Sequence, residues 1–121
     1  MAFILPFISN LATPQQNAWL TLLNQKLAPN KVMLPCNMTC EEKQQAKVAI
    51  IANPEPSELM AFTGLIWVQS LWAGVDRLFA EIPEPSFNIV RLEDPYLAQT
   101  MAEAVLTWTL YLHRQIPQYT A

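Results

Sequence analysis

The segment Ser70-Leu71-Trp72-Ala73-Gly74 has the residue types and the spacing of a small anion-binding turn. Gly74 is one of only two glycines in the chain, and a glycine can adopt a positive φ or let a ligand approach the backbone closely. Two successive main-chain N–H groups at such a turn, just before a predicted helix, would hold a small anion, and Trp72 would wall the pocket. The same residues also fit a purely structural interpretation, in which Gly74 turns the chain and Trp72 packs in the core.

The remaining reactive residue types do not form a catalytic or metal-binding motif. His113 is the only histidine, so neither a Ser-His-Asp triad nor a Cys-His pair is expected, and its place near a helix end fits a role at the helix dipole. Cys36 and Cys40 form a C-x-x-x-C pair without a second pair, which predicts free thiols in a reduced compartment rather than a zinc site. The adjacent acids Glu93 and Asp94 fit a helix cap. We therefore predict no catalytic residue and no metal site in this segment.

Composition limits the classes of partner. The 121 residues fit one domain, with 52% hydrophobic and 14% charged residues and a net charge of −3. No run of Lys or Arg is present, so we expect neither nucleic acid nor a membrane surface as a partner. Neither G-x-G-x-x-G nor a P-loop occurs, and any nucleotide must be held mostly by something else. So few charges cover the surface of a small domain thinly, which predicts an apolar partner surface.

We expect a cytoplasmic location. The apolar run at residues 2–5 has no basic residue before it and is followed by Pro6, which argues against a signal peptide. Residues 59–75 are uncharged but fall short of the ~20 that a membrane-spanning helix needs.

Apolar runs and breaker residues predict an α/β fold. Short apolar runs bounded by turn residues are typical of buried strands, and here they alternate with amphipathic or short helical segments. We predict strands at residues 3–8, 31–35, 47–52, 65–69 and 88–91, and helices at 14–27, 57–62, 75–80 and 96–116, with Thr13-Pro14 and Asp94-Pro95 each as N-cap and first helical position. This alternation indicates an open parallel sheet of about five strands with a long C-terminal helix.

Ligands of open parallel sheets bind at the carboxyl ends of the strands. In this chain those ends carry Ser9-Asn10, Asn53-Pro54, residues 70–74 and residues 91–94. The acids of a phosphoacceptor domain and the Gly-rich phosphate loop of a flavin-binding domain are both missing from these positions. The segment 70–74 is therefore the one with a specific expected geometry.

The predicted long helix is apolar on most of its circumference. Its polar stripe is narrow, consisting of Gln99, Glu103, Thr107 and Arg114. A helix of this kind is usually buried on most sides, and one small sheet can cover only one of them. We expect a second domain, a second copy or residues after Ala121 to cover the rest.

Several of these segments, taken in order, resemble the N-terminal part of D-isomer-specific 2-hydroxyacid dehydrogenases, in particular the branch that reduces glyoxylate and hydroxypyruvate. The resemblance covers residues 47–119 well and residues 1–46 only in pattern. The segments that carry it are Asn53-Pro54, Leu71-Trp72-Ala73-Gly74-Val75-Asp76, Val90-Arg91-Leu92-Glu93-Asp94, Met101-Ala102-Glu103 and His113-Arg114.

The resemblance implies a flavodoxin-like substrate domain in residues 1–94. Residues 95–121 would form a long inter-domain helix leading to a Rossmann cofactor domain that this chain lacks. It also implies a homodimeric enzyme that reduces a small 2-keto acid with NADPH or NADH. The loop matching Ala73-Gly74 would give backbone N–H groups to the substrate carboxylate, Trp72 would border the substrate, and Met101 could touch the cofactor. The catalytic Arg, Glu and His of the family lie downstream of residue 121, and His113 does not occupy the catalytic position.

Three hypotheses follow. The chain is the substrate-domain segment of a 2-keto acid reductase, inactive alone; or it is a non-enzymatic module that dimerises or binds a partner through its long helix; or it is a stand-alone domain that binds small acids. The sequence does not separate NADPH from NADH, because the residues that select between them would lie in the Rossmann domain.

Overall fold

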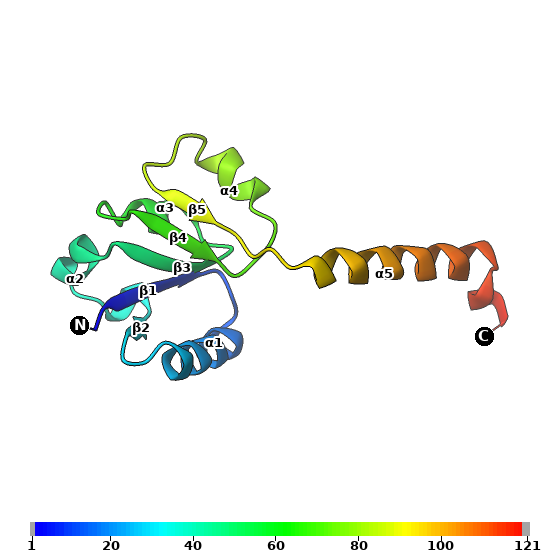
Figure 1. The fold of residues 1–121 in the computed structure, drawn as a ribbon, viewed down its shortest axis with the longest axis horizontal. Helices are drawn as coiled ribbons and strands as arrows, with labels where there is room; N and C mark the ends of the chain where they lie inside the picture. Colours follow the sequence, from blue (N-terminus) through cyan, green and yellow to red (C-terminus); the bar gives the residue numbers. More distant parts are fainter. Residues whose placement is uncertain (1, 120–121) are drawn as a thin grey trace.

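The computed structural model describes residues 2–119, which form a three-layer α/β unit followed by a projecting helix (Figure 1). The elements in chain order are β1 (Ile4–Ser9), α1 (Thr13–Lys26), β2 (Lys31–Met33), the 3-10 turn η1 (Pro35–Asn37), α2 (Cys40–Gln45), β3 (Val48–Ala52), α3 (Pro56–Met60), β4 (Trp67–Ser70), α4 (Asp76–Glu81), β5 (Asn88–Val90), α5 (Pro95–His113) and η2 (Ile116–Tyr119).

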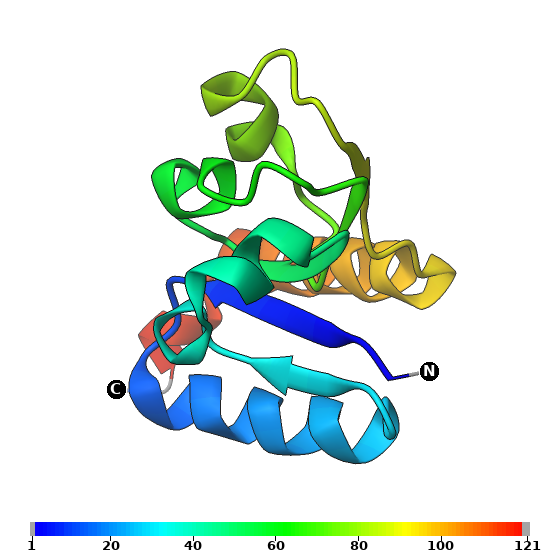
Figure 2. The same ribbon diagram turned by 90° about the vertical axis from the view of Figure 1, so that its left-hand side faces the viewer.

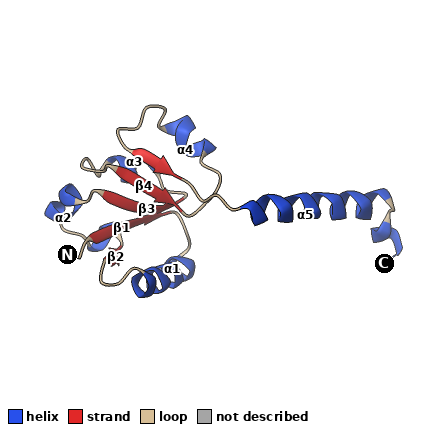
Figure 3. Cartoon of the chain, viewed as in Figure 1, coloured by secondary structure: helices blue, strands red, loops and turns tan. Residues whose placement is uncertain are grey.

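The five strands form one parallel sheet in the order β2-β1-β3-β4-β5. This is the strand order of flavodoxin-like folds, in which the chain reverses direction between β1 and β3 and leaves a crevice there for ligands. The fold class predicted from the sequence, an open parallel sheet with a long C-terminal helix, is confirmed. The carboxyl ends of β1, β3 and β4 point toward α5 in Figure 3.

Two apolar cores lie on opposite faces of the sheet. One core joins the face that contains Ile8, Ile51 and Val68 to α3 and α4, through side chains such as Leu59 and Leu78. The other core joins the face that contains Phe7 and Ile50 to α1. These side chains alternate along the strands because successive residues of a strand point to opposite faces. Figure 2 shows the result, with β1 between α1 and α3.

The α1 face of the sheet is only partly covered. Beside α1 lies an apolar hollow of about 810 Å³, whose lining includes Leu5, Ile50 and Trp67. One helix is about 10 Å wide, too narrow for five strands spaced about 4.8 Å apart, so part of this face remains open.

The helix α5 leaves the carboxyl edge of the sheet and projects away from it (Figure 1). Asp94 caps it as predicted, accepting a hydrogen bond from the N–H of Tyr96 at 2.9 Å. None of the residues of α5 is buried, and large apolar side chains such as Val105, Trp108 and Leu112 are exposed. The apolar surface that the sequence pattern predicted for this helix is therefore uncovered in the isolated chain.

Two predicted helix boundaries were wrong. The N-cap of α1 is Ala12 rather than Thr13, and no side chain caps it; Pro14 still lies in the first turn, where its missing N–H costs no helical hydrogen bond. The end of α5 is His113 rather than residue 116. Pro117 disfavours helical geometry in the residue before it and cannot donate a hydrogen bond, and the chain leaves the helix at Gln115 with a φ of 54°.

Candidate functional site

The turn predicted to bind an anion lies at the carboxyl end of β4, beside the linker that leads to α5. Ser70 is buried, with 4% of its surface exposed, and its Oγ accepts a hydrogen bond from the N–H of Trp72 at 3.1 Å. The carbonyl of Trp72 accepts a hydrogen bond from the N–H of Leu92 at 3.2 Å. The turn is thus fixed at Trp72 from both sides, by the strand before it and by the linker that follows β5.

The next two N–H groups, those of Ala73 and Gly74, have no hydrogen-bond acceptor among residues 2–119. Gly74 is exposed, and a Cβ added to it would meet no atom within 4 Å. Successive uncommitted N–H groups can bind the oxygens of a carboxylate. Both N–H groups are uncommitted, as the predicted anion turn requires, and their use by a ligand stays a prediction.

The structure excludes one of the two reasons predicted for a glycine at position 74, namely a positive φ. Neither Gly64 nor Gly74 has a positive φ, so the turn does not require glycine for its backbone conformation. The other predicted reason, the close approach of a ligand to the backbone, stays a prediction. Gly64 is different, because a Cβ there would lie 2.6 Å from the carbonyl oxygen of Gln44; it is a packing glycine.

Trp72 is 37% exposed, so the interpretation that buries it in the core is wrong. Its side chain borders two hollows. One, of about 30 Å³, also has Gly74, Asn53 and Arg77 in its wall. The other, of about 300 Å³, is apolar and lies against α1, near Trp19. Trp72 therefore stands at the edge of the turn, where a small ligand bound to the N–H groups would contact it.

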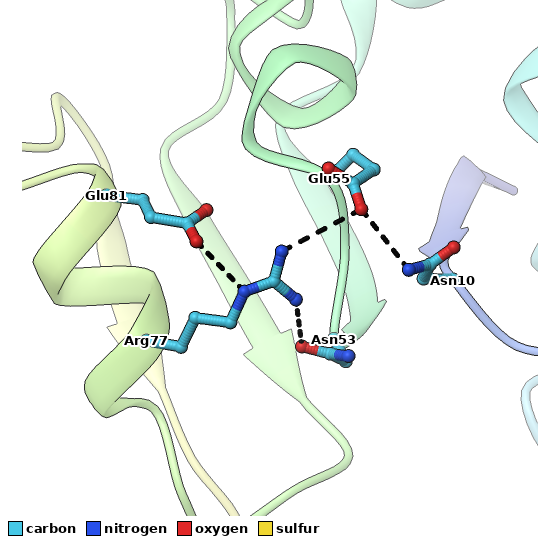
Figure 4. Close-up of polar contacts among 5 residues, drawn as sticks. All are labelled: Asn10, Asn53, Glu55, Arg77 and Glu81. Atoms are coloured by element: carbon cyan, nitrogen blue, oxygen red, sulfur yellow. Dashed lines mark hydrogen bonds and ion pairs between the residues drawn. The ribbon is translucent and has the colours of Figure 1, made fainter.

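A polar network joins the carboxyl ends of β1 and β3 to α4 (Figure 4). Three of its members, Asn53, Arg77 and Glu81, line the smaller hollow. The centre of the network is Arg77. Its Nε donates to Glu81 at 2.9 Å, its Nη1 donates to the Oδ1 of Asn53 at 2.7 Å, and its Nη2 lies 3.7 Å from the Oε1 of Glu55. That same Glu55 oxygen accepts a hydrogen bond from the Nδ2 of Asn10 at 3.2 Å.

This network lies at the carboxyl ends of β1 and β3, where the order of strands along the sheet reverses. Asn10 follows β1 and Asn53 follows β3, the two neighbouring strands from which the chain continues in opposite directions. Asn53 has a φ of 50°, a left-handed conformation that asparagine tolerates better than most residues, and the bond from Arg77 holds its side chain. Left-handed residues other than glycine often occur at binding sites, where the surrounding contacts hold them.

The charge of Arg77 is retained at any ordinary pH. The hydrogen bond and the charge of Glu81 raise the pKa of the guanidinium above its ordinary value, and Glu55 acts in the same direction. The crevice therefore holds one permanent cation between two carboxylates, all three at least partly exposed to solvent.

Sequence reasoning identified Asn53-Pro54 and Asn10 by their place after strands but missed Arg77, Glu55 and Glu81. One local signal was present, since Arg77 and Glu81 are spaced i, i+4, as in helical ion pairs. The contacts with Asn53 and Glu55 link residues 24 and 22 positions apart, and only the strand order brings them together.

The other candidates lie elsewhere. Met101, the predicted cofactor contact, is 58% exposed on α5. The structure does not place it beside the predicted substrate contacts at residues 72–74. His113 is the last residue of α5. Cys36 and Cys40 are exposed free thiols near α2.

Within residues 2–119, no group of three or more His, Cys, Asp or Glu side chains is placed to bind a metal ion. In the same range, no helix combines the length and apolarity needed to span a bilayer.

Comparison with known proteins gives one relevant similarity. No protein-family model matches the chain. Over 109 residues the chain is 30% identical to the glyoxylate/hydroxypyruvate reductase A of Escherichia fergusonii, and the alignment covers 85% of this chain and 34% of that protein. The chain thus spans about a third of the length of the curated relative it matches. The similarity agrees with the resemblance to 2-hydroxyacid dehydrogenases found in the sequence segments.

Proposed function

We propose that this chain supplies the substrate-binding part of an NAD(P)H-dependent reductase that converts a small 2-keto acid, glyoxylate or hydroxypyruvate, to the 2-hydroxy acid. The observation that carries the proposal is the pair of uncommitted N–H groups at Ala73 and Gly74. They lie at the carboxyl edge of a parallel sheet, where a Cβ added to Gly74 would meet no atom within 4 Å. The partial identity with a reductase of that name supports the choice of substrate class.

In this proposal the two N–H groups bind the carboxylate and thereby orient the neighbouring keto group. Fixing a reactant in one orientation can account for much of a rate enhancement. Trp72 covers one side of the bound acid and excludes water from it. The general acid and the residue that polarises the keto oxygen would come from residues outside this chain.

We assign cofactor binding mainly to residues outside this chain. The hollow at the turn, about 30 Å³, is far smaller than a dinucleotide, and the sequence contains no Gly-rich phosphate loop. NADPH or NADH would supply the hydride, and we assign its binding to a cofactor domain that follows α5, with Met101 as a contact from this chain. A homodimeric, cytoplasmic enzyme belongs to the same proposal.

The test is an activity assay on the native gene product purified from its source cells. The proposal predicts an intact mass well above the 13.7 kDa of this chain and oxidation of NADPH or NADH when glyoxylate or hydroxypyruvate is added. A full-length native product without such activity would contradict the proposal. A native mass near 13.7 kDa would leave the binding of small acids as the function of the turn.

A second candidate function is association through α5. The specific observation is that α5 buries none of its residues while Val105, Trp108 and Leu112 are exposed. These three, with Leu97 and Met101, follow the spacing of i, i+4 and i+3 that defines one helix face. We propose that, in the isolated chain, this face pairs with a second copy, and sedimentation analysis is the direct measurement.

A further inference from the structure

We infer that Arg77 binds the carboxylate of the incoming acid, and that Glu55 forms an ion pair with the guanidinium of Arg77 until the acid displaces it. The inference rests on the proposed function, because it concerns the ligand of the Ala73–Gly74 turn. It goes beyond that function by assigning a charged side chain and a competing carboxylate to the site.

The three contacts of Arg77 are unequal. Nε donates to Glu81 at 2.9 Å and Nη1 donates to Asn53 at 2.7 Å, whereas Nη2 lies 3.7 Å from Glu55. The last distance is an ion pair without a hydrogen bond. The guanidinium is therefore positioned by two short bonds and retains N–H donors on its Nη2 for another partner (Figure 4).

Arg77 and Gly74 line the same small hollow, together with Trp72. The space of about 30 Å³ exceeds the ~10–15 Å³ that one water requires, and it suits a carboxylate rather than a whole substrate. A carboxylate that enters this hollow at Gly74 therefore lies beside Arg77. Arginine suits this task because its planar fork of donors matches a carboxylate.

Glu55 has the properties of a displaceable partner. Its Oε1 keeps a second hydrogen bond, from the Nδ2 of Asn10 at 3.2 Å, and half of its side chain is exposed to solvent. On leaving Arg77 it would therefore remain solvated and hydrogen-bonded. Glu81 is bound more closely and lies one turn along the same helix, so it serves to hold the guanidinium in place.

This arrangement predicts the sign of a charge substitution. Glu55→Gln keeps the shape of the side chain and its acceptor for Asn10 but removes the negative charge that competes with the ligand. One unit charge at several ångströms in a solvated crevice corresponds to about a 3- to 5-fold change in affinity, so the variant should bind a carboxylate that much more tightly. If Arg77 only tied α4 to β3, Glu55→Gln would weaken binding or leave it unchanged.

The experiment is a titration of the isotope-labelled 121-residue chain with oxamate, a stable analogue of a 2-keto acid, followed by NMR of the backbone amides. Oxamide, its uncharged counterpart, is the ligand control. Glu84→Gln is the matched protein control, because it removes the same charge from the loop before β5, at the opposite edge of the sheet. Arg77→Gln and Arg77→Lys complete the series, and the urea midpoint of each variant reports its fold.

The inference predicts that Glu55→Gln tightens oxamate binding, that Glu84→Gln does not, and that Arg77→Gln weakens it more than Arg77→Lys. The gain from Glu55→Gln should shrink as salt is raised, because screening weakens charge effects at exposed sites. If oxamate shifts the Ala73 and Gly74 amides but Glu55→Gln binds no more tightly, the inference is overturned while the proposed function stands. If wild-type oxamate binding leaves those amides unchanged, both fall.

Discussion

The two glycines provide opposite predictions for the same substitution. Gly64→Ala places a Cβ 2.6 Å from the carbonyl oxygen of Gln44 and 3.3 Å from that of Ala46. Both contacts are with backbone, which cannot rotate away, so the chain must shift. Such overpacking costs about 1–3 kcal/mol, and we expect a lower free energy of unfolding by that amount.

Gly74→Ala should behave in the opposite way. The new Cβ meets no atom within 4 Å, and φ is not positive, so the folded state accepts the methyl group without strain. Alanine also restricts the unfolded chain, which stabilises proteins by about 0.4–1 kcal/mol at compatible positions. The free energy of unfolding of Gly74→Ala should therefore equal or slightly exceed that of the wild type.

The same methyl group should impair binding of the acid. The proposed function requires a carboxylate to approach the backbone closely at residue 74, and the methyl group is attached to that same residue, so it crowds the bound acid. Loss of one hydrogen bond to a charged group corresponds to about 1.5–3 kcal/mol, which is a weakening of tenfold or more, and Gly74→Val should have a larger effect.

Urea denaturation gives the stability of both variants, and oxamate titration gives the affinity. The reasoning predicts that Gly74→Ala is stable but binds weakly, whereas Gly64→Ala is destabilised and, where folded, binds normally. A Gly74→Ala variant that binds oxamate as tightly as the wild type would refute the assignment of the turn. A Gly74→Ala variant destabilised by more than about 1 kcal/mol would refute the structural premise that the position is free.

Three further predictions concern the supports of the turn and of the long helix. Ser70→Ala removes the acceptor for the N–H of Trp72 and should lower the free energy of unfolding by about 1 kcal/mol; an unchanged urea midpoint would contradict it. Asp94→Ala removes the N-cap of α5, which should cost about 1 kcal/mol of helix stability. Helical circular dichroism should decrease while the unfolding midpoint of the sheet is retained, and Asp94→Asn should behave like the wild type. Val105→Lys combined with Leu112→Lys places charges on the exposed face of α5 and should convert a self-associating chain to a monomer in sedimentation; association that persists would place the contact elsewhere.

Much of the fold could be predicted from local sequence. The five strands lie in short apolar runs, of which β1, β2 and β3 are followed within two residues by Asn or Pro. The order of strands and helices indicated a parallel sheet. The helix boundaries were less accurate, because Thr13 and Ile116 each lie next to a proline whose effect on the neighbouring backbone competed with the apolar pattern. The excess apolar surface of α5 was expected from its narrow polar stripe, but the sheet was expected to cover one side of the helix, and α5 buries no residue because it projects away from the sheet (Figure 1).

The site was predictable only in its local part. Trp72, Ala73 and Gly74 are consecutive, so one glycine and one aromatic residue were enough to identify the turn. Arg77 was not identified, because its partners Asn53 and Glu55 follow a different strand, and their proximity depends on the neighbouring positions of β3 and β4 in the sheet. The conformation of Gly74 also could not be predicted, since a glycine fits both a positive φ and a close approach to the backbone.

The measurement that tests the central claim most directly is the amide spectrum of the isotope-labelled chain with and without oxamate, read at Ala73 and Gly74. The account predicts that oxamate shifts these two amides, and to a lesser extent Trp72, in a saturable way, and that oxamide does not. Shifts that are absent at the turn, or equal for oxamate and oxamide, would contradict the claim that this turn binds the carboxylate of a 2-keto acid.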